Sequence, residues 1–176
     1  MFGRGMLSDD TEHSVFVAQS LIAHPDSADA FARRLAWCLR AWLLSLPAGV
    51  GSATLRAICK LWLGWPARSS GVWSAGNGPV MRVAPIGAFF AHAPERLEAY
   101  VRASTALTHR DPRATTGATI VARLVAWCVR EGLSERPPLE RFSEVLRGAG
   151  GDDEWNSIVT RIEEAAREDL PVPELA

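Results

Sequence analysis

The apolar residues of this chain recur at the spacing of an α-helix, and this pattern restricts the folds that the chain can adopt. The clearest case runs from Phe31 through Leu35, Leu39 and Trp42, which would form one wide apolar stripe along a helix. No segment shows the alternation of apolar and polar residues that a half-buried strand needs. The sequence therefore predicts an all-α protein.

Capping residues and prolines divide this pattern into separate helices. Asp26 and Ser52 are expected to cap the second and third helices, and Pro79 and Pro94 stand where helices are expected to begin. His24-Pro25 is expected to end the first helix. The expected helices cover about residues 12–23, 26–46, 52–63, 79–91, 94–107, 112–128, 138–147 and 154–167.

Length and charge exclude several classes of protein. The 176 residues suit one domain, and 48% of them are hydrophobic, which is enough for a packed core. Lys and Arg total 19 and Asp and Glu total 20, so the formal net charge is -1 and offers no basic field for nucleic acid. The most apolar stretch, from Leu35 to Leu46, is too short to span a bilayer. The start lacks the layout of a signal peptide. The charge balance and the short apolar stretch lead us to expect no nucleic-acid or membrane partner, and the reduced thiols described below indicate a cytoplasmic protein.

Cysteine, histidine and tryptophan carry three further predictions. Cys38, Cys59 and Cys128 are far apart and form no CxxC pair, which predicts buried, reduced thiols and neither a disulfide nor a zinc site. Three of the histidines are expected to be solvated, namely His13, His24 and His92. Four tryptophans lie in apolar stripes and are expected in the core: Trp37, Trp42, Trp62 and Trp127. Trp65 and Trp73 border a Gly-rich stretch and are candidates to line a pocket.

The first candidate site is Ser8-Asp9-Asp10-Thr11-Glu12, directly before a helix. At an irregular helix start, the Ser8 hydroxyl and the carboxylates of Asp9 and Asp10 can converge on one point, and such hard oxygen ligands suit Mg²⁺. A structural explanation competes with this one. Asp9-x-x-Glu12 resembles a capping box, and acidic residues stabilise the N-terminal end of a helix dipole.

The second candidate site is the segment from Ser74 to Arg82, which contains Gly76, Asn77 and Gly78. Two glycines and an asparagine allow positive φ, which would turn successive N–H groups into one concavity and form an anion or diphosphate cradle. The dipole of a helix beginning at Pro79 would add to it. The alternative is a tight turn into that helix with no ligand.

The third candidate site is Thr108-His109-Arg110-Asp111-Pro112, at a junction between two helices. From such a junction His109 can reach a ligand and donate a hydrogen bond or pack on a sugar. The alternative is that His109 complements the end of one helix while Asp111 caps the next.

Taken in order, the three segments resemble the ADP-ribosylglycohydrolase family, whose motifs are Ser/Thr-Asp-Asp-Thr-Glu, Gly-Asn-Gly-x-x-Met-Arg and Thr-His-x-Asp-Pro. The resemblance covers about residues 8 to 130. It implies an all-helical fold with two Mg²⁺ ions that cleaves the glycosidic bond between ADP-ribose and an acceptor. By resemblance, Ser8, Asp9 and Asp10 would be metal ligands, Asp9 and Asp10 also being catalytic. The substrate-binding residues would be Ser74, Gly76, Asn77, Gly78 and His109.

Two departures from the family pattern lead us to expect a single, partial domain over residues 1–176. Only seven residues precede Ser8, where the family has a further helix and an acidic residue. The family also has an Asp-x-Asp-Thr segment near its C-terminus, and here Asp152 and Asp153 are expected only to cap the last helix. Besides a hydrolase, the sequence leaves open an inactive ADP-ribose-binding module and a helical interaction protein, and it predicts uncovered apolar surface.

Overall fold

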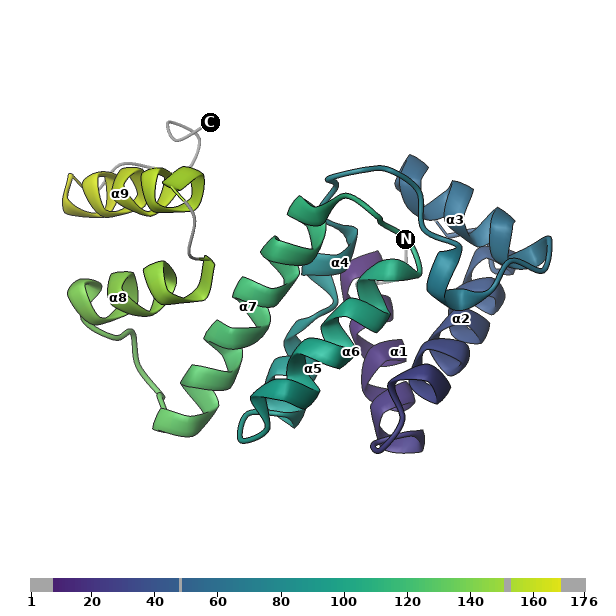
Figure 1. Cartoon of the computed structure of the whole chain (residues 1–176), viewed down its shortest axis with the longest axis horizontal. Coiled ribbons are helices and arrows are strands. Elements are labelled where there is room, and N and C mark those ends of the chain that lie inside the picture. Colours follow the sequence, from purple (N-terminus) through teal and green to yellow (C-terminus); the bar gives the residue numbers. More distant parts are fainter. Residues whose placement is uncertain (1–7, 48, 151–152, 169–176) are drawn as a thin grey trace, which may run out of the picture.

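The computed structural model describes residues 8–47, 49–150 and 153–168, and this part of the chain is built from helices (Figure 1). The predicted all-α class is confirmed. In chain order the helices are α1 (Asp9–Ala23), α2 (Ala28–Leu44), α3 (Ser52–Trp62), the 3₁₀ turn η1 (Ala67–Ser69), α4 (Gly78–Met81), α5 (Ala84–Phe89), α6 (Pro94–Ala106), α7 (Pro112–Glu131), α8 (Leu139–Gly150) and α9 (Asp153–Arg167).

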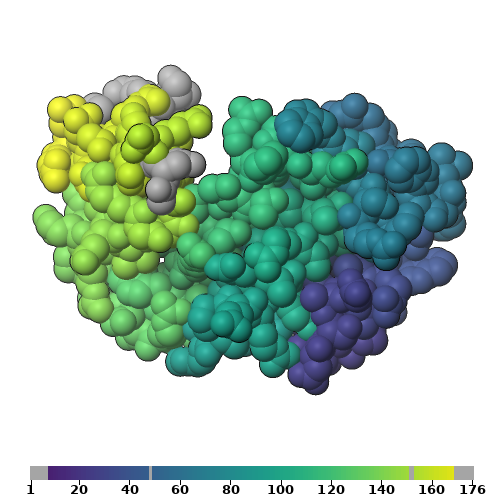
Figure 2. Space-filling model, in the orientation of Figure 1, coloured from purple at the N-terminus to yellow at the C-terminus, as the bar shows by residue number. Residues whose placement is uncertain are grey.

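The main hydrophobic core lies among α1, α2, α3, α5, α6 and α7. Phe31, Leu35 and Leu39 from the stripe of α2 are wholly buried in it, as the spacing predicts. Each such side chain stabilises the fold by roughly 1.5–3 kcal/mol. A second, smaller core joins Ile120 of α7 to α8 and α9. Helices α8 and α9 form a lobe at one end of the molecule, beside α7 (Figure 2).

The helix predicted from Pro79 to Ala91 is wrong, because it is two short helices that meet at Arg82 and Val83. Pro85 causes the break. It has no N–H to donate to the carbonyl of Met81, and its ring would clash with that carbonyl in a continuous helix. The Ser14 hydroxyl donates to the Met81 carbonyl instead, at 3.3 Å. The break also lets the side chain of Arg82 turn into the protein, where it is wholly buried.

Two predicted helix caps are also misplaced. Ser27, not Asp26, caps α2, and its hydroxyl accepts from the N–H of Ala30 at 3.2 Å. Gly51 occupies the capping position of α3, and Ser52 is its first helical residue. Asp153 is likewise the first residue of α9, and the other acidic residue expected to cap that helix, Asp152, lies outside the described residues.

Several side chains predicted to be buried are on the surface. Trp42 and Trp127 are buried, but Trp37 is 61% exposed and Trp62 is 48% exposed. The three cysteines are free thiols as predicted, yet Cys59 and Cys128 are exposed and Cys38 is only partly buried. Trp37 and Cys59 follow the wholly buried Leu35 and Ala57 by two positions, which places them about 200° around the helix, on its outer side. An apolar residue type does not by itself show that a helix position faces inward.

Candidate functional site

Residues from all three sequence segments line one cleft of about 230 Å³. Asp9 comes from the first segment, Ser74, Gly76, Asn77, Gly78 and Met81 from the second, and His109 from the third. The start of α3 and two aromatic side chains close the cleft, contributing His13, Trp42, Gly51, Ser52, Ala53 and Thr54. Segments that are up to 100 positions apart in the sequence therefore meet in the folded chain.

Backbone hydrogen bonds bring the second segment to the third. The N–H of Val72 donates to the carbonyl of Thr108 at 3.1 Å, and the N–H of Arg110 donates to the carbonyl of Val72 at 2.9 Å. This isolated bridge holds His109 opposite the loop that carries Gly76 and Gly78. His109 thus lines the cleft, while Asp111 caps α7 by accepting from the N–H of Arg113 at 3.0 Å. Asp111 therefore has the predicted structural role of a helix cap. His109 instead lies in the cleft, as the prediction that it can reach a ligand requires.

The glycines of the second segment serve a different purpose from the predicted one. None of Gly76, Asn77 and Gly78 has a positive φ, so the backbone conformation from which the cradle of successive N–H groups was predicted is not present. The four-residue α4 also has little dipole to offer. The glycines instead leave room for His109. A Cβ on Gly76 would lie 3.2 Å from His109 Nε2, and a Cβ on Gly78 would lie 2.9 Å from His109 Cε1.

In the first segment, one residue caps α1 and another lines the cleft. Ser8 caps α1, and its hydroxyl accepts weakly from the N–H of Thr11 at 3.4 Å. Asp9 is half-buried and lines the cleft, whereas Asp10 is exposed and is not among the lining residues. Glu12 does not complete the expected capping box with Asp9, because its carboxylate accepts from the indole N–H of Trp42 at 2.7 Å.

His13 was expected in solvent, and that prediction is wrong. Its ring is wholly buried and meets the ring of Trp42 edge-on, with centroids 4.4 Å apart. Neither ring nitrogen has a hydrogen-bond partner among the described residues. Burial, assisted by the charge of Arg82, lowers the pKa of His13 from 6.5 to about 3, so the ring is neutral at pH 7. A signal was available in the sequence, since Val17, Ser20 and Leu21 follow at helical spacing on the same buried face.

Arg82 ends the second candidate segment, but the sequence analysis assigned it no role, although its charge assists burial in lowering the pKa of both His13 and His109. The guanidinium is wholly buried and donates to the Ser104 hydroxyl at 3.1 Å, to the Ser104 carbonyl at 2.8 Å and to the Thr108 hydroxyl at 2.8 Å. Burial lowers the pKa of Arg82 to about 10, so it remains charged at pH 7. Burial and this charge together lower the pKa of His109 from 6.5 to about 4.

The proposed metal ligands supply only part of what a magnesium site needs. Mg²⁺ is often held through one or two carboxylates, with water in the remaining positions. Asp9 and Asp10 offer two carboxylates, of which only Asp9 lines the cleft. Within the described residues, no group of three or more His, Cys, Asp or Glu side chains is placed to hold one metal ion. Of the three predicted metal ligands, only Asp9 therefore lines the cleft, and the described residues do not form a two-metal site.

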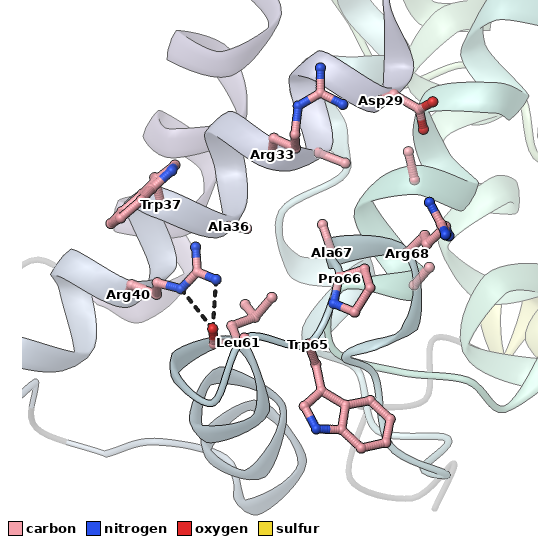
Figure 3. Close-up of a pocket in the computed structure, with 14 residues that line it drawn as sticks. Asp29, Arg33, Ala36, Trp37, Arg40, Leu61, Trp65, Pro66, Ala67 and Arg68 are labelled. Atoms are coloured by element: carbon pink, nitrogen blue, oxygen red, sulfur yellow. Dashed lines mark hydrogen bonds between the residues drawn. The ribbon is translucent and has the colours of Figure 1, made fainter.

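A second cavity, of about 450 Å³, lies between α2 and the segment around η1 (Figure 3). It shares no lining residue with the cleft. Arg40 donates two hydrogen bonds across it to the carbonyl of Leu61, at 3.1 and 2.6 Å. Trp65 lines this cavity, in line with its predicted role, whereas Trp73 lines neither cavity and is 73% exposed.

Comparison with known proteins agrees with the three segments. The family model described as ADP-ribosylglycohydrolase matches residues 1–176, and the chain belongs to this family. The predicted family membership is thus confirmed. An uncharacterized protein from Archaeoglobus fulgidus is 33% identical over 148 residues, which are 81% of this chain and 45% of the relative. The chain therefore spans less than half the length of that relative. Among the described residues, no helix is long and apolar enough to cross a membrane.

Proposed function

We propose that this chain provides the ADP-ribose-binding cleft of a hydrolase that cleaves the glycosidic bond between ADP-ribose and an acceptor. One observation carries the proposal: Asp9, the loop from Ser74 to Gly78, and His109 line a single cleft. These residues come from the three segments that resemble the family, and they meet only in the folded chain. The acceptor is a protein side chain or a small molecule, and the setting is the cytoplasm.

The cleft has the size and chemistry for the ribose-phosphate part of such a ligand. At about 230 Å³ it is smaller than the 300–1,000 Å³ of typical sites for complete ligands, so the rest of the ADP-ribose would lie outside it. The carboxylate of Asp9 can accept hydrogen bonds from ribose hydroxyls or from a water. His109 and the hydroxyl of Ser74 supply further polar atoms, and Gly76 and Gly78 add no side chain that would obstruct the sugar.

Mg²⁺ is part of this proposal, with Asp9 as the ligand in the cleft and Ser8 and Asp10 as the further candidates. When bound, the ion would orient the ribose hydroxyls and stabilise negative charge that develops on oxygen. The protein's own contribution is positional. Asp9 is held on the first turn of α1, and the Trp42–Glu12 hydrogen bond fastens that turn to α2.

The test compares Asp9→Asn with Asp153→Asn in two assays. Both residues are acidic and begin a helix, but Asp153 lies in α9 and does not line the cleft. We expect calorimetry to show ADP-ribose binding by the unaltered chain that strengthens with Mg²⁺. Asp9→Asn should lose that strengthening and Asp153→Asn should keep it. The second assay measures release of ADP-ribose from a modified protein, and Asp9→Asn should abolish it.

Each failure of this test has a distinct meaning. Binding without release supports the inactive ADP-ribose-binding module and rejects hydrolysis by this chain. No heat with millimolar ADP-ribose rejects both readings and favours a helical interaction protein. An Asp10→Asn variant that matches the unaltered chain in both assays would remove Asp10 from the metal ligands and from catalysis.

A further inference from the structure

The buried Arg82 connects α6 to the residue next to His109. Its guanidinium contacts Ser104 near the C-terminal end of α6, where unpaired carbonyls concentrate negative partial charge. That helix has no basic residue of its own in the last turn, so Arg82 supplies the cation there. With Ser104 holding it in place, the guanidinium directs one N–H to the Thr108 hydroxyl at 2.8 Å.

The Thr108 hydroxyl must then donate its hydrogen bond to His109. A guanidinium only donates hydrogen bonds, so the Thr108 oxygen accepts from Arg82. The same oxygen lies 2.9 Å from His109 Nδ1. If Nδ1 carried a proton, the oxygen would accept twice and its own proton would have no partner at a wholly buried position, which costs about 1–3 kcal/mol. If Nδ1 accepts, the Thr108 hydroxyl accepts from Arg82 and donates to His109, so its proton has a partner.

A neutral imidazole that accepts at Nδ1 carries its proton on Nε2. His109 is 3% exposed and stands against the glycine loop, with Nε2 facing Gly76. Nε2 has no hydrogen-bond partner among the described residues, and both His109 and Gly76 line the cleft. The Nε2–H group is therefore the polar edge that the ring offers to a ligand.

We infer that Arg82 and Thr108 are positioning residues that hold His109 as the Nε2–H tautomer, so that it donates a hydrogen bond to an oxygen of the bound ligand. That this oxygen belongs to ADP-ribose rests on the function proposed above. The orientation of the donor does not rest on it, because the hydrogen bonds that join Arg82 to Thr108 and Thr108 to His109 lie within the protein.

The tautomer can be measured directly by long-range ¹H–¹⁵N correlation spectra of the ¹⁵N-labelled chain, in which protonated and unprotonated ring nitrogens differ. The His109 signals are assigned by their loss in His109→Asn. We expect Nε2 to be protonated in the unaltered chain. Thr108→Val removes the hydroxyl and should produce a mixture of tautomers, whereas Thr108→Ser should restore the single form. A protonated Nδ1 in the unaltered chain would overturn the inference without any variant.

Thr105→Val is the matched control, because Thr105 is equally buried but its hydroxyl has no partner in the described part of the chain. Its His109 spectrum should match that of the unaltered chain. A folded Thr108→Val variant with an unchanged spectrum would also refute the inference. If Thr108→Val does not fold, the inference is tested by the unaltered chain and by Thr108→Ser. Both spectra should show a protonated Nε2, and a protonated Nδ1 in either would refute the inference.

Calorimetry with ADP-ribose then separates this inference from the proposed function. Thr108→Val should weaken binding roughly 3- to 10-fold, as expected for one misdirected hydrogen bond, and Thr105→Val should leave it unchanged. Equal affinity for both variants would reject donation to the ligand while leaving the proposed function intact. The expected tautomer with no ADP-ribose binding at all would reject the proposed function and leave the positioning roles of Arg82 and Thr108 standing.

Discussion

Replacing His13 tests the electrostatics of the buried site through the pH dependence of stability. The pKa of His13 falls from 6.5 to about 3 in the folded chain, so at intermediate pH the unfolded chain binds a proton that the folded chain does not. The contribution of neutral His13 to the free energy of unfolding is complete above pH 6.5 and is lost as the pH falls toward 3. The loss amounts to about 1.36 kcal/mol for each pH unit below 6.5. Lowering the pH from 7.5 to 5.0 should therefore reduce the free energy of unfolding by about 2 kcal/mol through this residue. His109, with its pKa lowered to about 4, adds a loss of the same sign.

His13→Leu should remove the His13 share of this loss. Neither ring nitrogen makes a hydrogen bond to a described residue, so the substitution breaks none and keeps an apolar contact with Trp42. Urea unfolding at pH 7.5 and pH 5.0 gives the loss for each protein, and the variant should lose about 2 kcal/mol less than the unaltered chain. His92→Gln, at an exposed position, should lose as much as the unaltered chain. Equal losses for His13→Leu and the unaltered chain would refute the reasoning.

Two glycine substitutions probe close packing. Gly78→Ala should displace the ring of His109, because the new Cβ would lie 2.9 Å from Cε1, and should weaken ADP-ribose binding in calorimetry, whereas Gly148→Ala, with open space around it, should not. Gly87→Ala places a Cβ against the backbone carbonyl oxygen of Ala122, where α5 packs on α7, in a contact too close for the two atoms to keep their positions. It should destabilise the fold by about 1–3 kcal/mol in urea unfolding, and a stability equal to that of Gly148→Ala would show that the crossing is looser than described.

The helical class, most helix positions and the family could be predicted because they depend on short-range patterns. Spacings of three and four residues predicted the helix that contains Phe31 and Leu35, and Asp111 before Pro112 predicted a cap that the structure confirms. Pro85 also carries a local signal for a helix break, and it was missed within an otherwise apolar segment. The part of the candidate site that followed from the sequence was its list of residues, from three motifs in order.

The arrangement of the site could not be predicted, since it depends on contacts between distant segments. The loop after Gly71 is held beside His109 by the backbone hydrogen bonds of Val72 with Thr108 and Arg110. Its glycines therefore make room for an imidazole, and their φ values do not form an anion cradle. The burial of Arg82 likewise requires the C-terminal end of α6 to lie beside it.

The sequence alone determined that this chain is helical, where most of its helices lie, and which three segments line the candidate cleft, because periodicity and motifs are properties of neighbouring residues. The tertiary structure decided which sides of the helices are covered: Trp37 is left on the surface, whereas His13 and Arg82 are enclosed. It also decided that His109 and Asp9 line the same cleft. The reason is physical. Burial and the resulting shifts in pKa depend on which helices pack together, and that packing is a property of the whole chain.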